Sequence, residues 1–188
     1  MTKTSKKKLT IVISGPPGSG STTVAKKLAK KLKLKLFVAG KLHKQLVKGW
    51  KKKEAKAALD AWKTDIGSSY KTHKKRDELQ VKIAKKGNVV ICSKLGIHFV
   101  GNLSKYKIWL DVPLKVRAKR AAGRDNIPLK EAEEEIRQRE KIERREWKKM
   151  YGFDSFNQKK YADFVLDSSK LSEEETVDRV LQFIKSKN

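Results

Sequence analysis

Residues 9–23 read LTIVISGPPGSGSTT, a short apolar run followed by a glycine-rich loop and two threonines. Gly15 and Gly20 have the spacing of the phosphate-binding loop G-x-x-x-x-G-K-[ST], and Thr22 occupies its hydroxyl position. Ser21 stands where that loop normally has its lysine. Because the backbone N–H groups of such a loop and of the helix that follows it bind phosphate, the missing lysine does not remove the site. The stretch therefore predicts a nucleotide-binding loop at the end of a buried strand.

The predicted loop assigns a role to each of its residues. The residues expected to contact the phosphates of a bound nucleotide are Gly15, Pro16, Pro17, Gly18, Ser19, Gly20, Ser21, Thr22 and Thr23. The hydroxyl of Thr22 is also the candidate ligand for Mg²⁺. The lysine that Ser21 replaces would neutralise charge on a transferred phosphoryl group, so catalysis is an open question at this point.

Short apolar runs alternate along the chain with segments of helical periodicity. The expected strands cover residues 9–14, 34–40, 87–93, 106–112 and 163–169, and the expected helices cover residues 22–34, 42–63, 129–150 and 173–184. This alternation predicts an α/β fold with a parallel sheet and helices on both of its faces. We expect a single domain over residues 1–188 with three regions, namely the phosphate loop and first helix (9–34), a lysine-rich region (40–86) and a hairpin (114–150).

The helix expected at 129–150 is charged nearly all round and has few apolar anchors. A helix that polar is usually a solvated arm or a lid rather than a core element. Together with Arg117, Arg120 and Arg124 on the preceding segment, it forms an arginine-rich hairpin. Guanidinium groups bind phosphate oxygens in pairs, but the same arginines could also pair with glutamates along their own helix. Both roles stay open.

The charge of the chain is strongly positive and unevenly distributed. Lys and Arg number 47 against 21 Asp and Glu, which gives a net charge of +26. Residues 1–100 hold 26 basic and five acidic side chains, and Arg76 is the only arginine among them. A field of this sign attracts RNA or DNA, whereas a lysine-rich genome would place the same lysines on solvated helix faces. Genome bias does not account for the shortage of acidic residues, and both interpretations stay open.

Cysteine content and hydropathy indicate the compartment. A single cysteine, Cys92, excludes an intramolecular disulfide, and no apolar run approaches the roughly 20 residues of a membrane span. The first residues, MTKTSKKKLT, are basic but precede only a short strand-like run, unlike a signal peptide. We therefore expect a cytoplasmic protein with no membrane partner.

Several stretches of the chain resemble cytidylate kinases, particularly the short archaeal type. In chain order they are IVISGPPGSGSTTVAKKLAKKL, KKGNVVI, KIWLDVPLKVRAKRAAGRDNI, EEIRQREKIERREWKKMYGFD and YADFVLDSSKLSEEE. The resemblance implies the P-loop nucleoside monophosphate (NMP) kinase fold, with a five-stranded parallel core, a small NMP-binding region and an arginine-rich helical lid. It also implies that ATP, with Mg²⁺, donates its γ-phosphoryl group to CMP or dCMP.

The lid half of the chain matches the family motif by motif. The segment that begins at Arg117 fits the family's R-x-x-R-x-x-x-R, and residues 139–144 fit its R-[DE]-x-x-[DE]-R. The catalytic arginines that the resemblance implies are Arg120, Arg124, Arg139 and Arg144.

The acceptor half departs from the family. Lys44 and Lys94 stand where the family has arginine, and Cys92 and Val38 keep neither charge nor hydroxyl. The resemblance implies substrate-binding roles for Lys44, Asp77 and Lys94. Lysine, however, cannot form the bidentate hydrogen bonds that arginine makes to a phosphate. Two functions therefore stay open. One is a monomeric, ATP-dependent CMP/dCMP kinase, and the other is a basic protein on the same fold that binds RNA or ribosomes.

Overall fold

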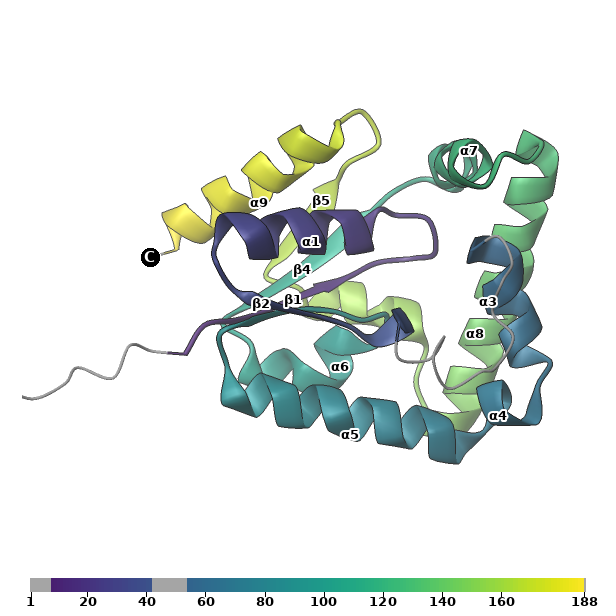
Figure 1. Ribbon diagram of the computed structural model, residues 1–188, viewed down its shortest axis with the longest axis horizontal. Helices are drawn as coiled ribbons and strands as arrows, with labels where there is room; N and C mark the ends of the chain where they lie inside the picture. Colours follow the sequence, from purple (N-terminus) through teal and green to yellow (C-terminus); the bar gives the residue numbers. More distant parts are fainter. Residues whose placement is uncertain (1–7, 42–53, 188) are drawn as a thin grey trace, which may run out of the picture.

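The computed structural model describes residues 8–41 and 54–187. Its centre is a five-stranded parallel sheet in the order β2-β3-β1-β4-β5 (Figure 1). The strands are β1 (Thr10–Ser14), β2 (Lys35–Val38), β3 (Val89–Cys92), β4 (Tyr106–Asp111) and β5 (Phe164–Asp167). The predicted α/β fold and each of the predicted strands are thereby confirmed.

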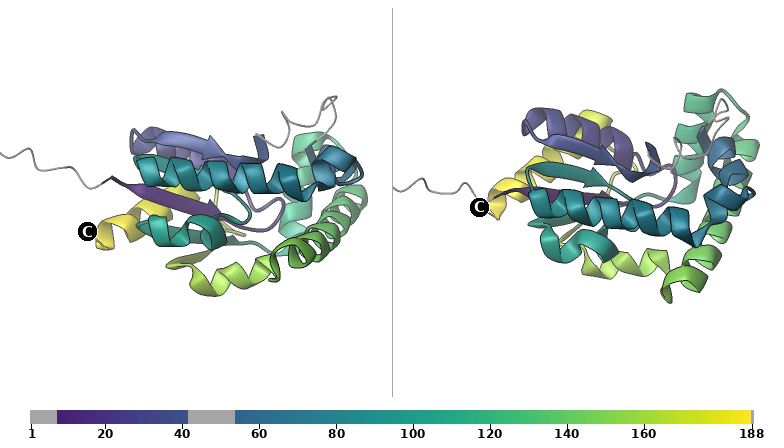
Figure 2. Two further views of the ribbon diagram at one scale, coloured as in Figure 1. Left: turned by 90° about the horizontal axis from the view of Figure 1, so that it is seen from below. Right: turned by 60° about the horizontal axis from the view of Figure 1, so that its bottom comes forward.

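Helices cover both faces of the sheet, as predicted. One face carries α1 (Ser21–Lys31) and α9 (Glu173–Ser186), and the other carries α5 (Tyr70–Lys86) and α6 (Gly96–Val100) (Figures 1 and 2). The other described elements are α3 (Glu54–Trp62), α4 (Asp65–Ser68), α7 (Leu114–Asp125), α8 (Leu129–Tyr151) and the 3₁₀ helices η1 (Gly101–Leu103) and η2 (Ser155–Tyr161).

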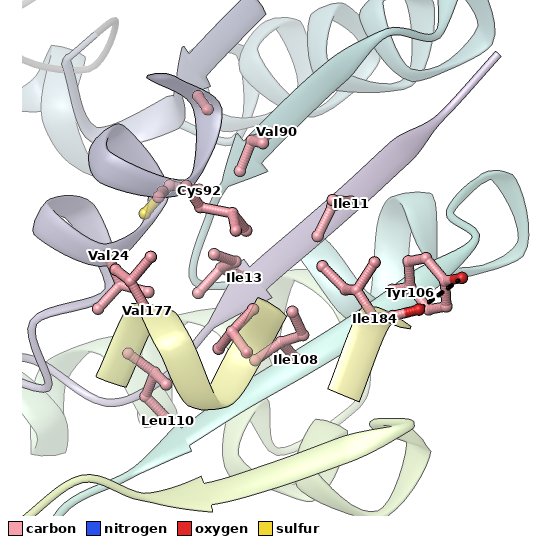
Figure 3. Packing of buried hydrophobic residues seen from close by; sticks show 14 residues of the cluster. Ile11, Ile13, Val24, Val90, Cys92, Tyr106, Ile108, Leu110, Val177 and Ile184 are labelled. Carbon is pink, nitrogen blue, oxygen red and sulfur yellow. Dashed lines mark hydrogen bonds between the residues drawn. The ribbon is translucent and has the colours of Figure 1, made fainter. Parts of the chain in front are cut away.

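β1 lies in the middle of the sheet because its side chains can be buried on both faces. Ile11 and Ile13 pack with Val24 of α1 and Val177 of α9 (Figure 3), whereas Val12 belongs to the cluster under α5 and α6. Burying one such side chain contributes about 1.5–3 kcal/mol. From β1 the chain runs first to β2 and β3 on one side and then to β4 and β5 on the other. The loop after β1 therefore lies at the point where strand order reverses, which is where open α/β sheets bind ligands.

A separate group of helices lies beyond the carboxyl ends of the strands (Figure 1). Ala118 and Ala121 of α7 pack against Ala132 and Ile136 of α8, and their small side chains let the two helices approach closely. α3 packs on both α7 and α8. These helices face the loop after β1 across the end of the sheet.

α8 starts where the long helix was predicted and ends one residue later, and it has a buried side although its composition is typical of a solvated arm or a lid. Ala132, Ile136, Glu143 and Trp147 are buried, at intervals of four, seven and four residues. This spacing makes one stripe along a helix. Ala132, Ile136 and Trp147 are among the few apolar anchors expected from the sequence, whereas the burial of Glu143 was not predicted.

Other boundaries differ from the prediction for local reasons. α1 ends at Lys31 rather than near residue 34, because Lys33 has a φ of 53° and cannot continue a right-handed helix. Residues 42–53 of the helix predicted at 42–63 lie outside the described residues, and the described part forms α3. α4 and α5 were not predicted as separate helices. α5 ends where Gly87 and Asn88 adopt positive φ angles of 69° and 54°.

Candidate active site

The loop of residues 15–20 joins β1 to α1 in a conformation that needs its glycines. Gly18 and Gly20 have φ angles of 81° and 86°, a region that L side chains rarely adopt. A Cβ on Gly15 would lie 2.7 Å from Oγ of Ser19 and 2.8 Å from the carbonyl oxygen of Leu110. α1 starts with no side-chain cap and no acidic residue in its first turn. Its first N–H groups and the positive end of its dipole are therefore available to an anion.

The loop forms one wall of a large cavity with a volume of about 990 Å³. This volume lies at the upper end of the range for small-molecule pockets. Its other walls come from the ends of β2 and β3, from α3 and α5, from α7 and α8, and from the segment between β5 and α9. Elements from the whole chain thus converge on the predicted phosphate loop.

Arg117 of α7 supports the loop from within the protein. Its Nε donates to the carbonyl oxygen of Val112 and its Nη1 to that of Pro17, both at 2.8 Å. Nη1 also lies 2.5 Å from Oε1 of Glu140. The side chain is 6% exposed, so its charge is satisfied by protein groups rather than by solvent. Arg117 therefore acts on the shape of the loop.

Three of the four arginines predicted to be catalytic line the cavity. Arg120 donates to the carbonyl oxygens of Ser19 (3.3 Å) and Ser168 (2.6 Å), so it lies between the loop and the end of β5. Arg124 forms two hydrogen bonds with Asp125, at 2.8 and 2.6 Å. Arg139 comes from α8. The sequence placed these three guanidinium groups on two helices, and the packing of α7 on α8 brings them to one side of the cavity.

Arg144, the fourth predicted catalytic residue, has other contacts in the described chain. It pairs with Asp154, and its guanidinium group lies 4.8 Å from the centre of the Phe156 ring. Its side chain is half exposed and is not among the residues that line the large cavity. A catalytic role for Arg144 stays a prediction.

Glu143 links α8 to the end of β3. Its Oε2 accepts from Nζ of Lys94 at 2.7 Å, and its Oε1 accepts from Nε of Arg139 at 2.8 Å. Burial, together with the positive charge of Arg139, lowers the pKa of Lys94 to about 7, against the opposing effect of Glu143. Burial disfavours ionisation of Glu143, but Arg139 and Lys94 outweigh it and hold the pKa of Glu143 below its ordinary value. Lys94 lines the cavity, and with a pKa of about 7 it is only partly protonated near neutral pH. Its substrate-binding role stays a prediction.

Arg76 of α5 is a cavity residue that the sequence analysis did not select. It is 7% exposed, and its Nε and Nη2 donate to Asp77 at 3.0 and 3.3 Å. Asp77 also accepts from the side chains of Gln80 (2.9 Å) and Tyr151 (2.5 Å) and does not itself line the large cavity. Predicted residue Lys44 lies outside the described residues. The signal for Arg76 was compositional, since it is the only arginine in a half of the chain full of lysines.

Aromatic side chains form the wall near Arg76. The rings of Trp62 and His73 stack with centroids 4.7 Å apart, and Trp147 meets Trp62 edge-on at 5.8 Å. All three line the cavity. Trp62 and Trp147 thus pack on each other. They do so, however, at the surface of the cavity, where an apolar wall suits a nucleobase.

Thr22 could provide one ligand for a divalent cation. Its Oγ1 lies 3.7 Å from Sγ of Cys92 at the end of β3. Burial raises the pKa of the Cys92 thiol, so the sulfur stays protonated and is a poor ligand for a hard cation. Within residues 8–41 and 54–187 there is no cluster of three or more His, Cys, Asp or Glu side chains that could hold a metal. A hydroxyl fits Mg²⁺ only as one ligand of a set completed by nucleotide phosphates and water.

Comparison with known proteins identifies the family. The model of the cytidylate kinase-like family matches residues 10–170. The chain belongs to this family. The cytidylate kinase of Pyrococcus horikoshii is 37% identical over 90% of this chain and 84% of its own. The cytidylate kinase of Sulfolobus acidocaldarius is 38% identical, and the match covers 95% of each chain. The resemblance predicted from the sequence is thereby confirmed.

Solved structures share the fold of this cytidylate kinase-like chain. Shikimate kinase from Bacteroides thetaiotaomicron has a TM-score of 0.64 at 17% identity, covering 95% of this chain and 99% of its own. Shikimate kinase from Aquifex aeolicus has a TM-score of 0.58 at 19% identity, covering 95% and 98%. At these identities the likeness shows the fold alone. The described part of the chain contains no helix that is long and apolar enough to cross a membrane.

Proposed function

We propose that this protein is an ATP-dependent kinase that phosphorylates CMP or dCMP to the diphosphate. The observation that carries the proposal is the convergence of the phosphate loop, three lid arginines and Lys94 on one cavity of about 990 Å³. Family membership and the names of the archaeal relatives support the choice of acceptor. A cavity of this volume has room for a donor and an acceptor nucleotide.

The donor end of the cavity is the phosphate loop. The N–H groups of the loop and of the first turn of α1 bind the β- and γ-phosphates of ATP. Arg120, held by Ser19 and Ser168, places its positive charge beside the loop. Mg²⁺, when bound with ATP, neutralises phosphate charge, and Thr22 is the residue that would contribute a ligand to it.

The acceptor end lies between Lys94, Arg76 and the wall formed by Trp62 and Trp147. The phosphate of CMP takes its place beside Lys94 and Arg139, where a phosphate would compete with the carboxylate of Glu143 for the same two cations. An acceptor phosphate is ionised at neutral pH, so the transfer needs no general base. An oxygen of that phosphate forms a bond to the γ-phosphorus of ATP as the bond to the bridging oxygen breaks, and ADP leaves.

The lid arginines take over the role of the absent loop lysine. The transferred group carries its charge on three equatorial oxygens, and planar guanidinium groups match several oxygens at once. Arg120, Arg124 and Arg139 supply such groups from one side of the cavity. Ser21 is therefore compatible with transfer, provided that these arginines close on the phosphates.

A coupled ADP-release assay across all NMPs and dNMPs tests the proposal. Shikimate should be included as an acceptor, and the protein should be stripped of nucleic acid. We expect the highest kcat/KM with CMP or dCMP. The matched control is Gly20→Val prepared in the same way, because a β-branched residue is incompatible with a φ of 86°. ADP release that persists in this variant, or a higher kcat/KM with another acceptor, would contradict the proposal.

A further inference from the structure

A second cavity, which we call the α5 groove, lies where α5 meets α6 and the end of α8. Its volume is about 450 Å³. In the right-hand view of Figure 2, α5 crosses the front of the molecule. The pair Arg76–Asp77 separates the two cavities, because Arg76 lines the nucleotide cavity and Asp77 lines the α5 groove. The proposed kinase reaction uses no residue that lines this groove.

One wall of the α5 groove is aromatic. Tyr151 lies with its ring centre 6.1 Å from that of Tyr70 and 5.1 Å from that of Phe99. Tyr70 is 52% exposed, so its ring is accessible to a ligand. The hydroxyl of Tyr151 donates to the buried Asp77 at 2.5 Å. Tyr151 is thus held in place before any ligand arrives, which lowers the entropy cost of stacking on it.

The other wall is a row of lysines on α5. Lys74, Lys82 and Lys85 line the groove, together with the carboxylates of Glu78 and of the buried Asp77. At 1.5 Å per residue, the row from Lys74 to Lys85 extends about 16 Å along the helix. The exposed lysines of α5 are Lys71, Lys74, Lys75, Lys82, Lys85 and Lys86, against one exposed acid, Glu78.

These lysines resemble the exposed Lys26 and Lys30 of α1 and differ from its other two lysines, which have acidic partners. On α1, Lys27 and Lys31 pair with acidic side chains of α9 at 2.7 to 2.9 Å, so their charge is offset within the protein. On α5, Lys74 is the one exposed lysine with a carboxylate at ion-pair distance in the described chain, and that distance to Glu78 is 4.0 Å. The positive charge of α5 is therefore directed to solvent or to a partner.

We propose that the α5 groove binds single-stranded RNA, with unpaired bases stacked on the aromatic wall and phosphates along the lysine row. Aromatic platforms beside a basic groove are the usual means of binding single strands, because every base has a face that can stack. A lysine row of about 16 Å fits a chain of several phosphates better than it fits one free nucleotide. RNA is the polynucleotide whose bases are most often unpaired, and a duplex would keep its bases from the aromatic wall.

Fluorescence anisotropy with labelled oligouridylate of about 12 nucleotides, a length within the usual site size, tests the proposal on the full chain. Salt is varied between about 50 and 200 mM, and the triple variant Lys74→Gln, Lys82→Gln, Lys85→Gln is compared with wild type. Loss of three lysine–phosphate contacts should reduce the steepness of log K, the logarithm of the RNA-binding constant, against log salt by about 2. The control triple, Lys26→Gln, Lys30→Gln, Lys35→Gln, removes the same charge from exposed positions on α1 and β2 and should leave most of the slope intact.

The aromatic wall is tested separately at one salt concentration. Tyr70→Ala should weaken RNA binding by about tenfold or more without changing the salt slope, whereas Tyr70→Phe should bind as wild type does. Excess ATP and CMP should not displace the RNA, because they occupy the other cavity.

Several outcomes would overturn the assignment. Equal losses in the two lysine triples, or no loss in Tyr70→Ala, would mean that the protein attracts any polyanion through charge alone. Displacement of the RNA by ATP or CMP would place it in the nucleotide cavity. Equal competition by polyglutamate, by a hairpin duplex or by single-stranded DNA would show that unpaired RNA is not the preferred occupant.

Discussion

Lys94 should limit the pH range in which this protein binds its acceptor. Its side chain is 25% exposed, and burial and Arg139 lower its pKa to about 7 in the absence of substrate. A lysine whose pKa is lowered is protonated below that pKa and loses its charge as the pH rises through it. Because only the protonated amine attracts a phosphate, the affinity for CMP should fall as the pH rises above neutrality.

The size of the effect follows from the pKa. Between about pH 7 and about pH 8.5, the protonated fraction of a group with a pKa of about 7 falls from about one half to about 3%. The KM for CMP should therefore rise about 16-fold over this range if neutral Lys94 contributes nothing to binding. The acceptor phosphate does not titrate in this window, since the second pKa of a phosphate monoester is about 6. The KM for ATP should stay level, because the loop binds phosphate through backbone N–H groups.

The assay is coupled ADP release at saturating ATP, with CMP varied at each pH. Lys94→Arg is the matched variant, because a guanidinium group stays charged over this range, and its KM for CMP should not change with pH. Glu143→Gln removes the carboxylate that raises the pKa of Lys94, so the rise in KM should begin at lower pH. A KM for CMP that is level in wild type, or that rises equally in Lys94→Arg, would refute this role of Lys94.

Three further predictions concern the loop and the lid. Gly18→Ala should abolish ADP binding measured by calorimetry, because the new Cβ would lie 3.0 Å from Cβ of Arg117 at a φ of 81°. The control Gly123→Ala places its Cβ in open space and should bind ADP normally. Equal ADP affinities of the two variants would contradict this prediction. Arg124→Ala should lower kcat by an amount equivalent to about 2–4 kcal/mol, which is the effect of losing one oxyanion-hole donor. The control is Arg137→Ala, which changes an exposed arginine and should keep wild-type turnover. If both variants turn over alike, the guanidinium group of Arg124 has no part in the transfer. Ser21→Lys should raise kcat in the same assay, and an unchanged rate would mean that the arginines already neutralise the phosphates fully.

The local sequence predicted the strands and helices better than it predicted which side chains are buried between them. The strands were recognisable because parallel strands buried on both faces are continuous apolar runs. α8 was predicted with the correct start and with a few apolar anchors, but the burial of Glu143 among them was not predicted. A carboxylate is buried here only because Lys94, 49 residues away in sequence, and Arg139 offset its charge. No periodicity in the sequence of α8 contains that information.

The phosphate loop, the alternating strands and helices, and the family could be predicted from the sequence. Each of these depends on residues that are neighbours along the chain: glycines at fixed spacing, an apolar run before them and a helix after them. Pairs between charged residues far apart in the chain depend instead on the tertiary structure. The tertiary structure places Arg76 at the nucleotide cavity and Asp77 at the α5 groove. It also joins Asp77 to Tyr151, 74 residues away in the sequence, and lowers the pKa of Lys94. The physical reason is that charge, burial and pKa depend on groups a few ångströms away in space, and those groups come together only when α5, α7 and α8 pack at the end of the sheet.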